Sequence, residues 1–181
     1  MTADQTADRT RAATTPADPS EADFEAELEL RSAPGSVYEA LTTLQGLAGW
    51  WSTVTGDATA GGELRFFFGD DVPTIMRVDV ARPAELVRWT CLGYAHLPEW
   101  AGTTITFALA PGADGGCLLS FRHHGLTPKL ACWNDCKNGW SHFLPSLRDY
   151  VDTGTGQPWQ SPADVERRQA RDRQRTSLPA D

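Results

Sequence analysis

Residues 127–154 decide the fold of this chain, and they read TPKLACWNDCKNGWSHFLPSLRDYVDTG. Large apolar side chains recur there every three or four positions, at Leu130, Trp133, Cys136, Trp140, Phe143, Leu144, Leu147 and Val151. This spacing is typical of a helix with one buried face. It predicts one long amphipathic helix near the C-terminus, with Pro145 as a candidate kink.

The segments before this helix alternate with the two-residue period of half-buried strands. FEAELEL at 24–30 places Phe24 and Leu28 on one face and glutamates on the other. Five more β-rich runs follow from residue 63, separated by Gly, Pro or Asp: ELRFFF, TIMRVDV, ELVRWTCL, TTITFALA and CLLSFRHH. A shorter strand is expected at 53–57. Short connections such as ARPA and PGADGG favour antiparallel pairing.

Residues 32–51 carry helical spacing that is broken around Gly46, which predicts two short helices after the first strand. The order of elements predicts an α+β fold: a curved antiparallel sheet of six to seven strands wrapped around the long C-terminal helix. Such a sheet leaves room for a cavity beside the helix, where a ligand would bind.

The two ends of the chain differ in composition from this central part. Residues 1–22 are rich in Thr, Ala, Asp and Pro, and we expect a disordered leader. Residues 155–181 are densely charged, and we expect a disordered tail, although Ser161 and Pro162 would suit the start of a short charged helix. The predicted domain therefore covers residues 23–154.

Composition excludes several classes of function. The formal net charge is -8 over 181 residues, which argues against binding to nucleic acid because phosphate contacts need clustered Lys and Arg. The sequence lacks an apolar run long enough to span a bilayer and a secretory signal, so we expect a cytoplasmic protein that does not bind membranes. Its four cysteines show no CxxC pairing, and reduced thiols are expected.

Several motifs, in this order, resemble one known family. They are Pro34 with Val37 and Leu41, LAGWW at 47–51, Gly61-Gly62, ARPAEL at 81–86, GTTITFAL at 102–109, SFRHHGL at 120–126, and Gly139-Trp140 followed by FLPSLRDYV. Residues 23–154 resemble the SRPBCC superfamily of START-like, birch-pollen-allergen-like helix-grip domains. More narrowly, they resemble bacterial homologues of the heat-shock-protein-90 ATPase activator. The resemblance implies a helix-grip fold that serves as a container in polyketide cyclases, lipid carriers and hormone receptors.

The aromatic side chains of the domain are the first candidates for a ligand site. They either line an apolar pocket or fill the core: Trp51, Phe66, Phe68, Trp89, Phe107, Phe121, Trp133 and Trp140. Of the adjacent pair Trp50 and Trp51, we expect Trp51 on the cavity side.

Three polar features add candidate chemistry. His123 shares a strand face with Phe121 and points inward, where it is either a general base or a core histidine with satisfied hydrogen bonds. Arg77 either anchors an anionic ligand or lies on the solvated face of the sheet. Cys132 and Cys136 share a helical face, but no further ligand has suitable spacing, so no metal site is predicted.

We therefore expect a cofactor-free, non-enzymatic domain that binds a small hydrophobic molecule as a monomer or homodimer. One alternative is a cyclase or dehydratase in which His123 accepts a proton and Arg77 or Tyr94 stabilises an enolate. A second alternative is a chaperone partner that stimulates ATP hydrolysis. Independently of function, Gly61 and Gly62 predict a tight reversal with at least one positive φ, which points Leu64, Phe66 and Phe68 inward.

Overall fold

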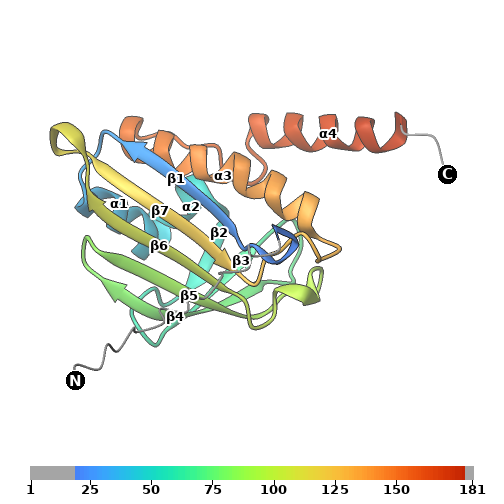
Figure 1. The fold of residues 1–181 in the computed structure, drawn as a ribbon, viewed down its shortest axis with the longest axis horizontal. Helices are drawn as coiled ribbons and strands as arrows, with labels where there is room; N and C mark the ends of the chain where they lie inside the picture. The colour runs from blue at the N-terminus through green and yellow to red at the C-terminus, as the bar shows by residue number, and fades with distance from the viewer. Residues whose placement is uncertain (1–18, 178–181) are drawn as a thin grey trace, which may run out of the picture.

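The computed structural model describes residues 19–177 and forms a single antiparallel sheet with helices on its concave side (Figure 1). The strand order is β1-β7-β6-β5-β4-β3-β2. The strands are β1 (Phe24–Leu30), β2 (Thr53–Gly56), β3 (Glu63–Phe67), β4 (Thr74–Arg82), β5 (Leu86–Gly93), β6 (Thr104–Pro111) and β7 (Cys117–His124). All six strand pairings are antiparallel, which confirms the predicted sheet.

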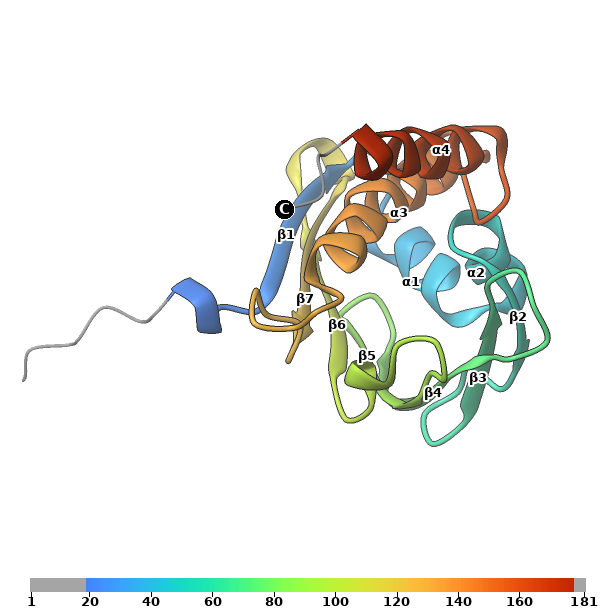
Figure 2. The same ribbon diagram turned by 90° about the vertical axis from the view of Figure 1, so that its right-hand side faces the viewer.

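Within residues 19–177, four α-helices complete the fold: α1 (Pro34–Thr42), α2 (Leu44–Trp50), α3 (Trp133–Thr153) and α4 (Pro162–Ser177). Single turns of 3-10 helix lie at Pro19–Glu21, Pro98–Trp100 and Ala113–Gly115. Figure 2 shows the sheet curling around α1, α2 and α3, with α4 over the outer side of α3. The predicted α+β helix-grip fold is confirmed.

Local sequence explains where the helices begin and end. Pro34 opens α1, where its missing N–H costs no hydrogen bond. Thr43 separates α1 from α2, and its hydroxyl accepts a hydrogen bond from the Gly46 N–H at 3.0 Å. Helix α3 runs through Pro145 and ends at Gly154, whose φ of 82° is the left-handed cap that glycine adopts without strain.

The turn between β2 and β3 follows the glycine prediction. Gly61 has a φ of 90°, in the region that favours glycine, and its N–H donates to the Val78 carbonyl at 2.8 Å. The register that follows buries Leu64 and Phe66 completely, while Arg65 is exposed. The predicted reversal with a positive φ is confirmed, as are the inward-facing Leu64 and Phe66, whereas Phe68 follows the end of β3 and is only partly buried.

The C-terminal segment differs from the expected disordered tail. Residues 162–177 form α4, which contacts α3 through long side chains: Arg167 donates to Asn138, and Arg175 donates to Asp135 at 3.2 Å. Charged composition alone predicted disorder, whereas these contacts and the completely buried Asp164 hold the helix in place. Of the expected leader, residues 1–18 lie outside the described residues.

Candidate functional site

The interior between α3 and the sheet is filled by aromatic side chains. Phe66, Trp89 and Phe107 are completely buried, and Phe121 is 2% exposed. The rings are in direct contact, with centroids 5.1 Å apart for Trp89 and Phe107 and 5.2 Å apart for Phe107 and Phe121. These predicted ligand residues therefore form the core, because side chains from several strands close the space that the fold encloses.

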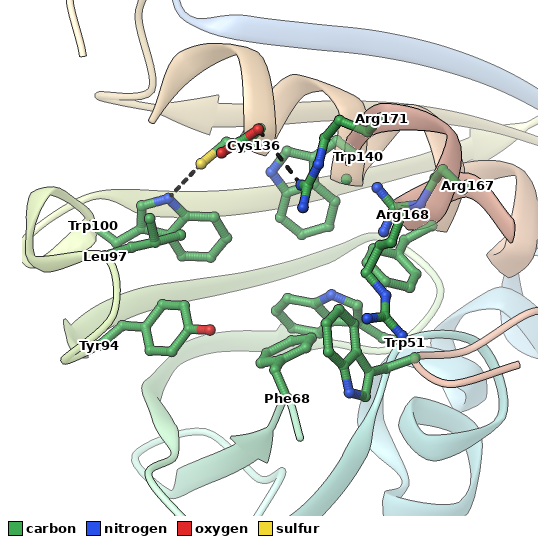
Figure 3. Close-up of a pocket in the computed structure, with 14 residues that line it drawn as sticks. Trp51, Phe68, Tyr94, Leu97, Trp100, Cys136, Trp140, Arg167, Arg168 and Arg171 are labelled. Atoms are coloured by element: carbon green, nitrogen blue, oxygen red, sulfur yellow. Dashed lines mark hydrogen bonds and ion pairs between the residues drawn. The ribbon is translucent and has the colours of Figure 1, made fainter. Parts of the chain in front are cut away.

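A partly open pocket of about 190 Å³ lies at one end of this core, between α3, α4 and the segment 94–100 (Figure 3). Three of the predicted aromatic residues line it: Trp51, Phe68 and Trp140. Sequence reasoning missed most of the other lining residues, which include Leu97, Trp100, Trp159, Arg167, Arg168 and Arg171. The pocket thus combines an aromatic floor with a rim of arginines.

Trp51 connects the core with the pocket. Its ring stacks on Trp89, with centroids 5.9 Å apart and planes 4° apart, and lies 5.3 Å from the Trp140 ring. Its backbone carbonyl accepts a hydrogen bond from the backbone N–H of Trp159 at 2.8 Å, which fixes Trp159 beside it. Trp50 stacks on Trp51, with ring centroids 5.7 Å apart, and is completely buried; its indole N–H donates to the Ala40 carbonyl at 3.1 Å.

Small residues let α2 approach α3 closely enough to form this corner. A Cβ added at Gly49 would lie 2.2 Å from the ring of Tyr150 on α3. Such a contact is shorter than van der Waals packing allows, so a side chain at this position would have to displace the Tyr150 ring.

Tyr94 and Trp100 form the side of the pocket that lies opposite α4. Figure 3 shows the Tyr94 hydroxyl directed toward the pocket interior. Burial, together with the charge of Asp70, raises the pKa of Tyr94 above its ordinary value, so the phenol is neutral at physiological pH. The Trp100 indole N–H donates to Cys136 Sγ at 3.2 Å. Burial raises the pKa of the Cys136 thiol, which therefore stays protonated and unreactive.

His123 lies behind the pocket and does not line it. It is completely buried, and the Trp140 indole N–H donates to its Nδ1 at 3.0 Å. Its Nδ1 therefore carries no proton, and its Nε2–H donates to Thr103 Oγ1 at 2.9 Å. Burial lowers the pKa of His123 to about 3, which outweighs the attraction of Asp23. Neither ring nitrogen is free to accept a proton from a ligand, so the cyclase alternative loses its candidate base.

Two predicted ligand residues lie away from the pocket. Arg77 is half-exposed on the outer face of β4, where its Nε donates to Asp79 Oδ1 at 2.8 Å. Of the two predicted placements of Arg77, the structure shows the solvated face of the sheet, because the neighbours Met76 and Val78 face inward and alternation turns Arg77 outward. Trp133 packs beside Phe24 of the edge strand β1, with ring centroids 6.2 Å apart, and does not line the pocket.

The arginine rim comes from one face of α4. Asp164 is completely buried and accepts hydrogen bonds from Arg167 at 2.6 Å and Arg168 at 2.9 Å. Burial alone would raise the pKa of Asp164, but hydrogen bonds from Arg167, the Gln160 N–H and Arg168 lower it below its ordinary value. The Arg168 guanidinium lies 4.1 Å from the Trp159 ring centroid, and the Arg171 guanidinium lies 3.5 Å from Asp135.

A sequence signal for this rim exists. Arg167, Arg171 and Arg175 follow one another at intervals of four, which places them on one helical face. Such a stripe on a predicted tail is usually solvated, and only its contacts with α3 show otherwise. Among residues 19–177, no three His, Cys, Asp or Glu side chains are placed to hold a metal ion, and all four cysteines are free.

The sequence of this chain also matches a known protein family. Residues 15–152 match the sequence profile of the family described as Activator of Hsp90 ATPase homolog 1-like protein. The chain belongs to this family. The predicted resemblance to the SRPBCC superfamily and to homologues of the activator is thereby confirmed. No curated protein sequence matches the chain. Helix α4 and its arginines lie beyond the residues that the family profile matches.

Solved structures share the fold of this activator-homologue family. The Aha1 dimer from Colwellia psychrerythraea is 26% identical with a TM-score of 0.65, over 75% of this chain and 99% of that chain. CalU16 from Micromonospora echinospora is 19% identical with a TM-score of 0.61, over 85% of this chain and 86% of that chain. DynU16, from the dynemicin biosynthetic locus, is 24% identical with a TM-score of 0.58, over 73% of this chain and 48% of that chain. This chain thus spans about half the length of DynU16.

The helices between residues 19 and 177 of this activator-homologue domain lack the combined length and apolarity that crossing a bilayer requires.

Proposed function

We propose that this chain binds a small apolar molecule in the pocket between α3, α4 and residues 94–100. The observation that carries the proposal is the aromatic lining, because Trp51, Trp100 and Trp140 present ring surface to a space that protein atoms leave unfilled. Pockets with mostly apolar walls and a few placed polar groups are typical of small-molecule sites.

The size of the pocket sets the size of the ligand. Its volume is about 190 Å³, and a protein cavity of ~150 Å³ accommodates benzene. One or two fused rings, or a short aliphatic chain, would fill the enclosed part and extend through the open side. The superfamily, whose members act as containers for apolar molecules, supports the same class of ligand.

Gly139 provides a direct test because it lines the pocket from α3. A Cβ added there meets nothing within 4 Å, so a larger side chain would enter the pocket without displacing protein atoms. We expect wild-type protein to bind the neutral fluorophore N-phenyl-1-naphthylamine saturably, and Gly139→Leu to weaken that binding about tenfold or more. Gly139→Ala should bind nearly as well as wild type and be slightly more stable, since Ala favours a helix by about 0.5–1 kcal/mol.

A matched control adds the same leucine on the exposed face of α3, as Ser141→Leu, and should leave binding unchanged. Equal binding by wild type and Gly139→Leu would place the probe elsewhere and contradict the proposed pocket. Absence of saturable binding across a broad set of apolar probes would contradict the proposed function itself.

A further inference from the structure

We propose that the ligand of this pocket is an amphipathic organic acid, whose anionic group binds to the guanidinium groups of Arg168 and Arg171 while its apolar body rests on the tryptophans. This inference rests on the proposed function and specifies the chemical class of the ligand. Its basis is the arrangement of charge and of free donors along the α4 side of the pocket.

The charges around the pocket do not balance. Arg167, Arg168 and Arg171 line it, and the carboxylates that pair with them are Asp164, Asp135 and the more exposed Asp172. Asp135 is in addition shared with Arg175, at 3.2 Å. These four arginines meet three carboxylates, which leaves one positive charge in excess along this face of α4, on a protein whose formal net charge is -8. An anion placed there gains an attraction that most of the molecular surface does not offer.

Donor groups at the same wall are also left over. The Nε atoms of Arg167 and Arg171 are buried and have no hydrogen-bond partner among the described residues. Arg168 uses its Nε for Asp164 and one face for the Trp159 ring, so its terminal nitrogens still have donors to offer. A carboxylate or sulfonate oxygen in the pocket would accept charge-assisted hydrogen bonds from these terminal nitrogens.

The pocket separates these donors from its apolar surface. Figure 3 shows the arginine side chains extending from α4 on one side, and Tyr94 and Phe68 on the other. Trp159 links the two regions, because Arg168 stacks on its ring while its backbone is bonded to Trp51. A ligand with an acidic head at α4 and a ring body directed toward Trp100 and Trp140 would satisfy both regions at once.

Two probes with the same ring system test the inference. N-phenyl-1-naphthylamine is neutral, and 8-anilino-1-naphthalenesulfonate adds one sulfonate to the same skeleton. We expect the sulfonate to bind about tenfold more tightly, as charge-assisted hydrogen bonds to arginine suggest. Higher salt should reduce this advantage, since it screens the charge at a partly open site.

Variants of α4 separate the head group from the apolar body. Arg168→Gln should weaken the sulfonate about tenfold and change the neutral probe less than about twofold. Arg168→Lys, which keeps the charge, should retain part of the preference. Arg173→Gln is the matched control, because it removes an exposed charge from the same helix at a position that does not line the pocket, and both probes should bind as to wild type.

The outcomes distinguish this inference from the function on which it rests. Equal affinity of the two probes, or equal losses for both in Arg168→Gln, would overturn the acid-binding inference while leaving the apolar site standing. Failure of both probes to bind wild-type protein would overturn both proposals. If Arg168→Gln melts at a much lower temperature than wild type, Arg171→Gln provides the same test.

Discussion

The buried His123 makes the stability of the protein depend on pH in a window that few other groups affect. Its pKa is 6.5 in an unfolded chain and about 3 in the native structure, because burial disfavours the charged ring. Between these values the unfolded chain binds a proton that the native protein does not bind. Stability from this group is therefore fully present above pH 6.5 and is lost as the pH falls toward 3.

The magnitude follows from the two pKa values. At pH 5 the unfolded chain gains about 2 kcal/mol from protonation of this one histidine, relative to pH 7.5, while the native protein gains almost nothing. This figure changes little if the native pKa is one unit higher, since the ring stays neutral at pH 5 in either case. Asp23, whose pKa is lowered to about 2, loses its contribution only in more acidic solution.

The assay is urea unfolding, followed by tryptophan fluorescence, of wild type and His123→Gln at pH 7.5 and pH 5. Glutamine does not titrate, so the free-energy advantage of wild type over the variant should shrink by about 2 kcal/mol between the two pH values. Burial also lowers the pKa of His142, which gives a slope of the same sign, but that slope occurs in both proteins and cancels. An advantage that stays constant with pH would refute the assignment of His123 as a neutral, doubly hydrogen-bonded core residue.

Two further predictions concern the turn before β3 and the attachment of α4. Gly61→Ala should lower the free energy of unfolding by about 1 kcal/mol or more, because the φ of 90° at this position strains an L-residue. Gly35→Ala is the control and should not lower it. Equal stability of the two variants in urea would contradict the prediction. Asp164→Asn removes the buried partner of two arginines, so trypsin should cleave α4 about tenfold faster than in wild type. Asp172→Asn, at an exposed position of the same helix, is the control and should be cleaved at the wild-type rate. Unchanged cleavage would show that α4 is held by other contacts.

The sequence alone determined the elements of residues 23–154 and most of their faces. Alternation placed Phe24 and Leu28 of β1 inward, and the helical repeat of residues 133–153 placed Trp140 and Leu147 against the core. These predictions succeeded because strand and helix periodicity is a property of the local backbone, and each face must be buried or solvated as a whole.

Only the tertiary structure decided which aromatic residues fill the core and which line the pocket. Phe66 and Phe68 lie two positions apart with the same chemistry, yet Phe66 is completely buried and Phe68 reaches the pocket. That difference depends on the volumes of side chains that arrive from distant segments, such as Trp159 beside Phe68, with ring centroids 5.6 Å apart.

The tertiary structure also decided where the arginine rim lies. Nothing local shows that Arg175 will meet Asp135, since 40 residues separate them and a charged helix is stable in water only when it finds partners. Likewise, the sequence placed His123 inward but did not reveal that Trp140 and Thr103 occupy both of its ring nitrogens. Chemical roles depend on such partners, which come together only when the chain has folded.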